Sequence, residues 1–119
     1  MGTPQDKLTM ISKLKKNWNG YGACEFDREA IRFARDITDS LPAEPQIFPM
    51  ADGGIQIDLW DGDRNLSIIV NHDGMFASVM TYESAELIHE QKTKTISEVS
   101  DMAKTWFEMK EPAEYPRMS

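Results

Sequence analysis

The fold is decided by residues 53–80, which read GGIQIDLWDGDRNLSIIVNHDGMFASVM. Apolar residues alternate with polar ones around Ile57 and again around Ile68, and this period of two is typical of strands with one buried face. Two Asp-Gly pairs, at 61–62 and 73–74, interrupt the runs. Asp-Gly favours tight hairpin turns because both residues tolerate positive φ. The stretch therefore predicts an antiparallel meander.

Two helices are predicted before the meander. Thr3 followed by Pro4 is typical of a helix start, and apolar residues at helical spacing extend this helix over residues 4–17. Asp27 is a suitable cap for a second helix, whose apolar stripe continues until Pro42 ends it. Both helices are amphipathic, so we expect each to cover an apolar surface.

The rest of the chain adds one strand before the meander and one helix after it. Residues 46–50 predict a first strand, and Pro49, which cannot donate a ladder hydrogen bond, places it at an edge of the sheet or at a bulge. Residues 81–90 are ambiguous between an extension of the fourth strand and a short helical turn. A capping box at residues 95–98 begins a terminal helix that runs to about Met109 and is expected to pack across the sheet. The predicted fold is α+β, with a four-stranded antiparallel meander sheet packed on one face by helices in the order ααββββα.

The chain length fits one domain. A chain of 119 residues can bury a modest core, and we expect residues 1–110 to form a single α+β domain followed by a flexible C-terminal tail at 111–119. Cys24 is the single cysteine, which excludes an intrachain disulfide and fits a reducing compartment. The sequence has no long apolar run and no basic segment leading into one, so we expect a cytoplasmic protein without membrane association.

The charge of the chain limits its partners. Twenty acidic and 13 basic residues give a formal net charge of −7. Such a balance argues against direct binding of nucleic acid or of an anionic membrane surface, since both require cationic side chains. An acidic surface is compatible with a protein partner that presents a basic surface.

No motif for metal binding or catalysis is complete. Asp61, Asp63 and Asn65 fall at the first, third and fifth positions of a calcium loop, but Leu66 stands where glycine is needed and His72 where glutamate is needed. A hairpin turn accounts better for this segment. Pairs of carboxylates are frequent in an acidic chain, and no base or cation is placed beside them by spacing. We therefore predict no cofactor, no metal and no catalytic residue.

Two short segments of the sequence resemble elements of a known group of proteins. Residues 17–23 read NWNGYGA and residues 49–54 read PMADGG. They resemble a group of small bacterial and phage proteins with an N-W-[DN]-G-Y-G-A element after a first helix and a P-x-x-D-G-G element entering a strand, a group without established function. Trp60 stands one position away from the Trp that tends to close this strand in the group. The resemblance implies a setting in mobile genetic elements and host–phage conflict.

These observations lead to a functional hypothesis. We expect a non-enzymatic acidic protein-binding module, a phage-encoded inhibitor of a bacterial defence complex of the CRISPR type, which blocks a basic surface. Trp60 would be the apolar anchor among neighbouring carboxylates. The expected partner-binding residues are Asp58, Trp60, Asp61, Asp63 and Asp73.

Other functions remain open at this level. The chain could be an antitoxin-like partner of a toxin, or a small enzyme with a pocket lined by Glu25, Asp58 or His72. A homodimer through the edge strand near Pro49 or through exposed face residues is a further alternative. The sequence also leaves open whether three of its aromatic residues are buried in the core or exposed as a recognition surface. These residues are Trp18, Tyr21 and Trp60.

Overall fold

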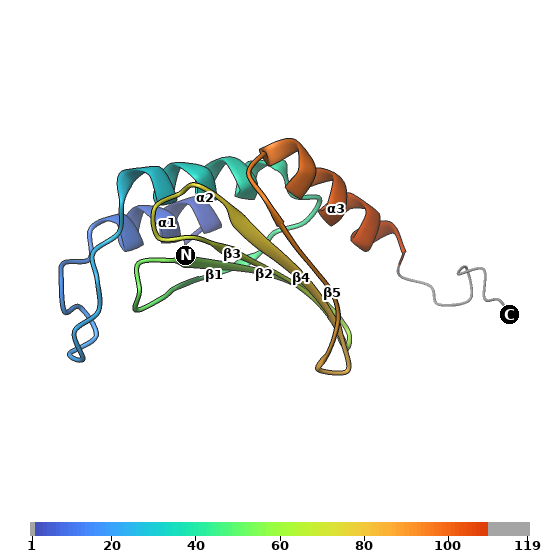
Figure 1. Cartoon of the computed structure of the whole chain (residues 1–119), viewed down its shortest axis with the longest axis horizontal. Coiled ribbons are helices and arrows are strands. Elements are labelled where there is room, and N and C mark those ends of the chain that lie inside the picture. The colour runs from blue at the N-terminus through green and yellow to red at the C-terminus, as the bar shows by residue number, and fades with distance from the viewer. Residues whose placement is uncertain (1, 110–119) are drawn as a thin grey trace, which may run out of the picture.

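A computed structural model describes residues 2–109 of the chain. Within them, three helices cover one face of a five-stranded antiparallel sheet (Figure 1). The elements in chain order are α1 (Pro4–Ser12), α2 (Arg28–Ser40), β1 (Gln46–Pro49), β2 (Ile55–Asp61), β3 (Arg64–Val70), β4 (Ala77–Glu83), β5 (Glu86–Thr93) and α3 (Ile96–Glu108). The predicted α+β class is confirmed. The predicted tail at 111–119 lies outside the described residues.

The predicted number of strands is wrong. Residues 81–90 form neither a helical turn nor a single extended strand, because β4 ends at Glu83 and the chain reverses into β5. Ser84 and Ala85 make this reversal with φ values of 49° and 67°. Two-residue hairpin turns with positive φ usually carry Gly or Asn, so the Ser-Ala pair gave no turn signal. The sheet therefore has five strands and the order is ααβββββα.

The sheet is a simple meander in which each strand pairs with its neighbour in the chain, in the order β1-β2-β3-β4-β5. One row of side chains crosses it on the helix side: Ile47 pairs with Ile57, Ile57 with Ile68, and Ile68 with Val79. All four are buried. The prediction of an edge strand at 46–50 is confirmed, since β1 pairs with β2 alone and ends at Pro49.

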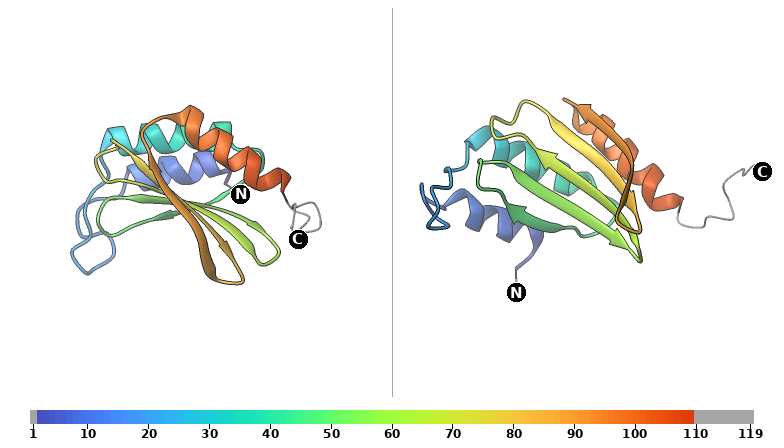
Figure 2. Two further views of the ribbon diagram at one scale, coloured as in Figure 1. Left: turned by 45° about the vertical axis from the view of Figure 1, so that its right-hand side comes forward. Right: turned by 60° about the horizontal axis from the view of Figure 1, so that its bottom comes forward.

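The helices begin where their caps predict. The side chains of Thr3, Asp27 and Thr95 each accept a hydrogen bond from a backbone amide in the first turn of α1, α2 and α3. The buried stripe of α2 includes Ala34 and Ile37, which pack over the middle of the sheet. The helix α3 packs chiefly against α2 and runs beside β5 (Figure 2), whereas the sequence predicted packing across the sheet.

The first helix is shorter than predicted, because it ends at Ser12 and not at residue 17. In the loop that follows, the side chain of Asn17 accepts a hydrogen bond from the Gly22 amide at 2.6 Å, and Asn17 itself has a φ of 65°. Asparagine side chains that bond to nearby backbone compete with helix formation. Trp18 is half-buried against Phe26, with ring centroids 5.9 Å apart, whereas Tyr21 is exposed.

Candidate functional site

The face of the sheet away from the helices carries Trp60, the predicted apolar anchor. At one end of this open face, Trp60 pairs with Asn65, Asn65 with Tyr82, and Tyr82 with Leu87. The indole of Trp60 is 59% exposed. Trp60 thus faces away from Ile57 and Leu59, as the alternation along β2 predicts.

A pocket of about 350 Å³ lies next to this row, lined by Trp60, Asp63, Asn65, Tyr82, Ser84 and Ala85. Two bonds tie its rim together: the Ser84 amide donates to the Asp63 carbonyl at 2.9 Å, and the Ser84 hydroxyl donates to the Asp63 carboxylate at 2.6 Å. The β2–β3 turn is therefore fastened to the β4–β5 turn. The pocket, here called the Trp60 pocket, combines aromatic walls with a carboxylate at the rim.

The pocket could hold an apolar or aromatic side chain. Tryptophan and tyrosine provide large flat contact areas with a polar edge, which makes them frequent anchors of protein interfaces. Asn65, which is buried, lines the pocket, and its side-chain amide donates a hydrogen bond to the Leu59 carbonyl at 3.0 Å. Asp63 is exposed, so a cationic side chain of a partner could reach it.

Asp58 lies on the same open face but is only 5% exposed. Its carboxylate accepts a hydrogen bond from the Ser67 hydroxyl at 2.8 Å and another from the Gln56 amide at 3.0 Å. A carboxylate engaged in this way holds neighbouring strands together. Asp58 therefore supports the open face from within the sheet.

Asp61 lies at the end of β2 on the helix side and forms an ion pair with Arg64 at 3.3 Å. The guanidinium of Arg64 is buried over the ring of Trp106, with its central carbon 4.5 Å from the ring centroid. It also donates to the Trp106 carbonyl. Asp61 thus neutralises an arginine that fastens α3 to the sheet.

Asp73 lies at the opposite end of the sheet, in the turn between β3 and β4. Its carboxylate accepts hydrogen bonds from the Asn71 side chain at 2.6 Å and from the Met75 amide at 3.0 Å. These bonds, that of Asn71 first, lower the pKa of the Asp73 carboxyl. The fold therefore brings Trp60 and Asp63 together at one pocket, and it buries Asp58 nearby on the same face of the sheet. Asp73 lies at the other end of the sheet, away from all three.

A second depression, of about 320 Å³, bears on the enzyme alternative. It is lined by Cys24, Glu25, Phe26, Asp27, Asp52 and His72. Within residues 2–109, however, no hydrogen bond joins the Cys24 thiol to the His72 imidazole, and no three His, Cys, Asp or Glu side chains are placed to hold a metal ion. The depression thus contains several titratable side chains, but its cysteine and histidine do not form the nucleophile–base hydrogen bond that nucleophilic catalysis uses.

Sequence reasoning missed Tyr82, Ser84 and Ala85 as parts of the site. They belong to the hairpin between β4 and β5, which was not predicted, and no local signal marks them. Only the pairing of β3 with β4 brings Tyr82 beside Asn65. The Trp60 pocket is therefore a product of strand register.

The chain matches no family model, no curated protein and no solved structure. The resemblance of residues 17–23 and 49–54 to small bacterial and phage proteins stays a prediction. In the described part of the chain, no helix has both the length and the apolar character needed to cross a bilayer. The function has to be argued from the geometry of the surface.

Proposed function

We propose that this chain is a non-enzymatic protein-binding module that docks a basic partner through the Trp60 pocket. The observation that carries the proposal is the Trp60 side chain, 59% exposed beside a pocket of about 350 Å³ on a sheet face without helices. A large exposed aromatic residue next to a pocket is the usual form of an interface anchor.

Charge supports a basic partner. The formal net charge is −7, and Asp63 at the pocket rim has no cationic neighbour at ion-pair distance among residues 2–109. Complementary charge accelerates association and selects against acidic competitors. A lysine or arginine of the partner would meet Asp63 while an apolar side chain fills the pocket.

The mechanism would be occlusion of the partner's basic surface. The resemblance to phage proteins makes a defence complex of the CRISPR type the first partner class to test, and a toxin would be bound by the same contacts. The depression around Cys24 and His72 keeps a small enzyme as the second candidate. These candidates differ in stoichiometry, because an inhibitor or antitoxin forms a stable complex whereas an enzyme turns over.

The test is a comparison of two exposed apolar residues at opposite ends of the sheet. Trp60→Ala removes the anchor, and Met75→Ala removes a side chain that is 63% exposed at the far end. We expect Trp60→Ala to weaken a stoichiometric complex captured from bacterial lysate about 30-fold or more, since anchor residues contribute about 2 kcal/mol or more. Met75→Ala should bind like the wild type.

Salt dependence tests the charge component of the same complex. Binding should weaken at high salt, because the distance over which exposed charges interact falls from about 8 Å at physiological ionic strength to about 3 Å at 1 M. Asp63→Asn should reduce this salt dependence. A captured complex that binds Trp60→Ala and Asp63→Asn as tightly as the wild type would contradict the proposal, provided that circular dichroism shows both variants folded.

A further inference from the structure

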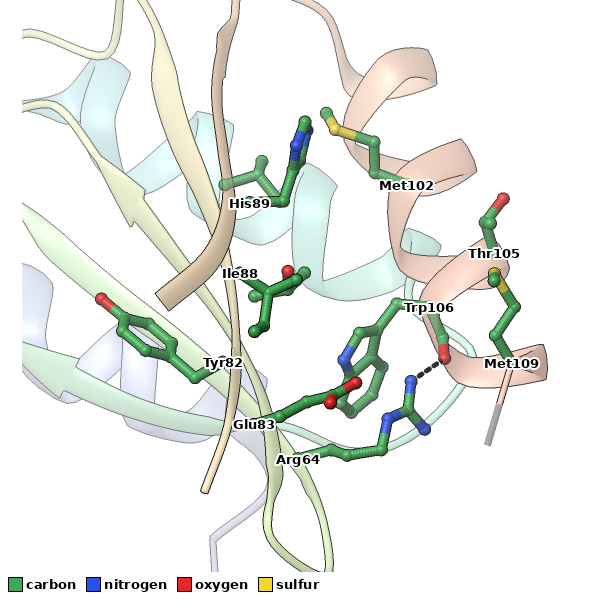
Figure 3. Close-up of a pocket in the computed structure, with 11 residues that line it drawn as sticks. Arg64, Tyr82, Glu83, Ile88, His89, Met102, Thr105, Trp106 and Met109 are labelled. Carbon is green, nitrogen blue, oxygen red and sulfur yellow. Dashed lines mark hydrogen bonds between the residues drawn. The ribbon is translucent and has the colours of Figure 1, made fainter. Parts of the chain in front are cut away.

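A third cavity, of about 360 Å³, lies on the helix side of the sheet between β5 and α3. Figure 3 shows Ile88 and His89 extending from β5 into the space in front of α3, while Met102 and Trp106 extend from α3 toward β5. Most of the lining is apolar. This groove, here called the β5–α3 groove, is on the opposite side of the sheet from the Trp60 pocket.

One wall of the groove is a sheet edge. The eight-residue strand β5 pairs with β4 and is the last strand of the sheet, so no strand among residues 2–109 covers its outer edge. Such an edge offers unpaired N–H and C=O groups to an extended chain. Because α3 packs chiefly against α2, it leaves room beside β5.

A β-bulge adapts this strand to the groove. The register shifts between Thr81 and Tyr82, where Thr81 pairs with His89 and Tyr82 with Leu87. Ile88 is the extra residue, and a bulge re-aims side chains in this way. As a result both Ile88 and His89 line the groove, and Ile88 is 56% exposed there.

Two carboxylates lie together at the β4–β5 turn beside the groove. Glu83, which lines the groove, pairs directly with Glu86 across β4 and β5 and with Arg64 across β3 and β4. Like charges in this position destabilise a sheet, and neither carboxylate has a cation at ion-pair distance among the described residues. Deeper in, the buried Arg64 side chain lines the groove with a Nε that has no hydrogen-bond acceptor in residues 2–109.

We propose that the β5–α3 groove binds an extended segment of a basic protein, which adds to the outer edge of β5 as a sixth strand. An apolar side chain of the segment would pack between Ile88 and Trp106. Its lysine or arginine neighbours would face Glu83 and Glu86, relieving the repulsion between them. Strand addition supplies main-chain hydrogen bonds, and the groove supplies selectivity for side chains.

This site extends the proposed function, since it takes the same class of partner, but of its lining residues it shares only Tyr82 with the Trp60 pocket. A partner could use either side of the sheet alone. The groove is therefore tested with a peptide, without any partner from a lysate, and the Trp60 pocket serves as the comparison.

The probe is a fluorescein-labelled heptapeptide in which Lys alternates with Val or Leu, titrated with the full chain and followed by fluorescence anisotropy. A matched peptide carries Glu in place of every Lys. Ile88→Asn is compared with Leu87→Asn, because Leu87 is the neighbouring residue, 47% exposed, and pairs with Tyr82 on the open face. Both are surface positions, so both variants should fold.

We expect the Lys peptide to bind and Ile88→Asn to weaken it about tenfold or more, the effect of losing one buried aliphatic side chain. Leu87→Asn should change its affinity less than twofold, and the Glu peptide should bind at least tenfold more weakly. Amide exchange of β5 residues should slow when the peptide is bound. Equal binding of both peptides, or binding that is lost in Trp60→Ala and kept in Ile88→Asn, would overturn the proposal and leave the Trp60 pocket as the docking site.

Discussion

The same dipeptide, Asp-Gly, closes the turns at both ends of β3, yet the two turns have different surroundings. A Cβ on Gly74 would lie 2.5 Å from the backbone carbon of Glu29 in α2, so this turn packs directly against a helix. A Cβ on Gly62 would meet nothing within 4 Å. Both glycines have positive φ, 73° and 65° respectively. The dipeptide determines the local turn conformation, and contact with the helices determines whether the turn is packed or exposed.

This difference divides the sheet into a packed end and a projecting end. At the packed end, the turn between β3 and β4 lies close to the first turn of α2, and Asp73 bonds within its own loop. At the projecting end, the β2–β3 and β4–β5 turns extend past the helices (Figure 1) and carry the Trp60 pocket. The turn at the packed end is held against α2, whereas the two turns at the projecting end form the rim of the Trp60 pocket.

The largest effect should come from a methyl group added at each turn. Gly74→Ala combines a left-handed backbone with a clash against the backbone of α2, and we expect a loss of about 3 kcal/mol or more in the free energy of unfolding. Gly62→Ala has only the backbone cost, about 1 kcal/mol. Urea unfolding of the two variants measures both values. Equal losses would show that the two ends are packed alike.

A smaller effect of opposite sign is expected at the β4–β5 turn of the projecting end. Ala85 has a φ of 67°, a conformation that costs a non-glycine residue about 1 kcal/mol or more. Ala85→Gly should therefore raise the free energy of unfolding by about 1 kcal/mol, as judged by the same urea titration. The control is Ala77→Gly in β4, a buried strand position where glycine should destabilise. A destabilised Ala85→Gly variant would contradict the strain assigned to this turn.

The smallest effect concerns pH at the packed end. Hydrogen bonds from Asn71 and Met75 lower the pKa of Asp73 in the folded state below its ordinary value of about 3.9. The charged form thus stabilises the fold above that ordinary value, and this contribution is lost as the pH falls through the lowered folded pKa. In Asn71→Ala the pKa of Asp73 should move back toward 3.9. Carboxyl shifts in an NMR titration measure this directly, and an unchanged pKa would exclude the Asn71 bond as its cause.

Strong local patterns made most of the fold predictable. The alternation around Ile57 and Ile68 is present in the sequence, and so are the caps at Asp27 and Thr95. Each of these features depends on residues that are close in the chain. The same alternation predicted which face of the sheet the helices cover, because the apolar residues of each strand lie on that face.

The fifth strand was not predictable on the same grounds. Seven of the eight residues of β5 are exposed, so the strand has no buried apolar stripe, and its turn carries Ser84-Ala85 in place of Gly or Asn. What makes β5 a strand is backbone pairing with β4. Tertiary context of this kind overrides local propensity.

The candidate site was predictable only in part. Trp60 and Asp63 were named from the sequence and share a pocket, but Asp58, Asp61 and Asp73 do not line it. Closeness in sequence could not show that β3 separates Asp63 from Asp73 by the length of a strand, or that Ser67 and Gln56 engage Asp58. Tyr82 joined the site through strand register alone.

Every strand of the sheet pairs with the strand next to it in the chain. A meander of this kind needs only short loops to close before its hydrogen bonds form, so the entropy cost of each step is small. Refolding of the sheet should accordingly be faster than is usual for sheets assembled from distant strands, and hairpins formed by β2, β3 and β4 are suitable nuclei.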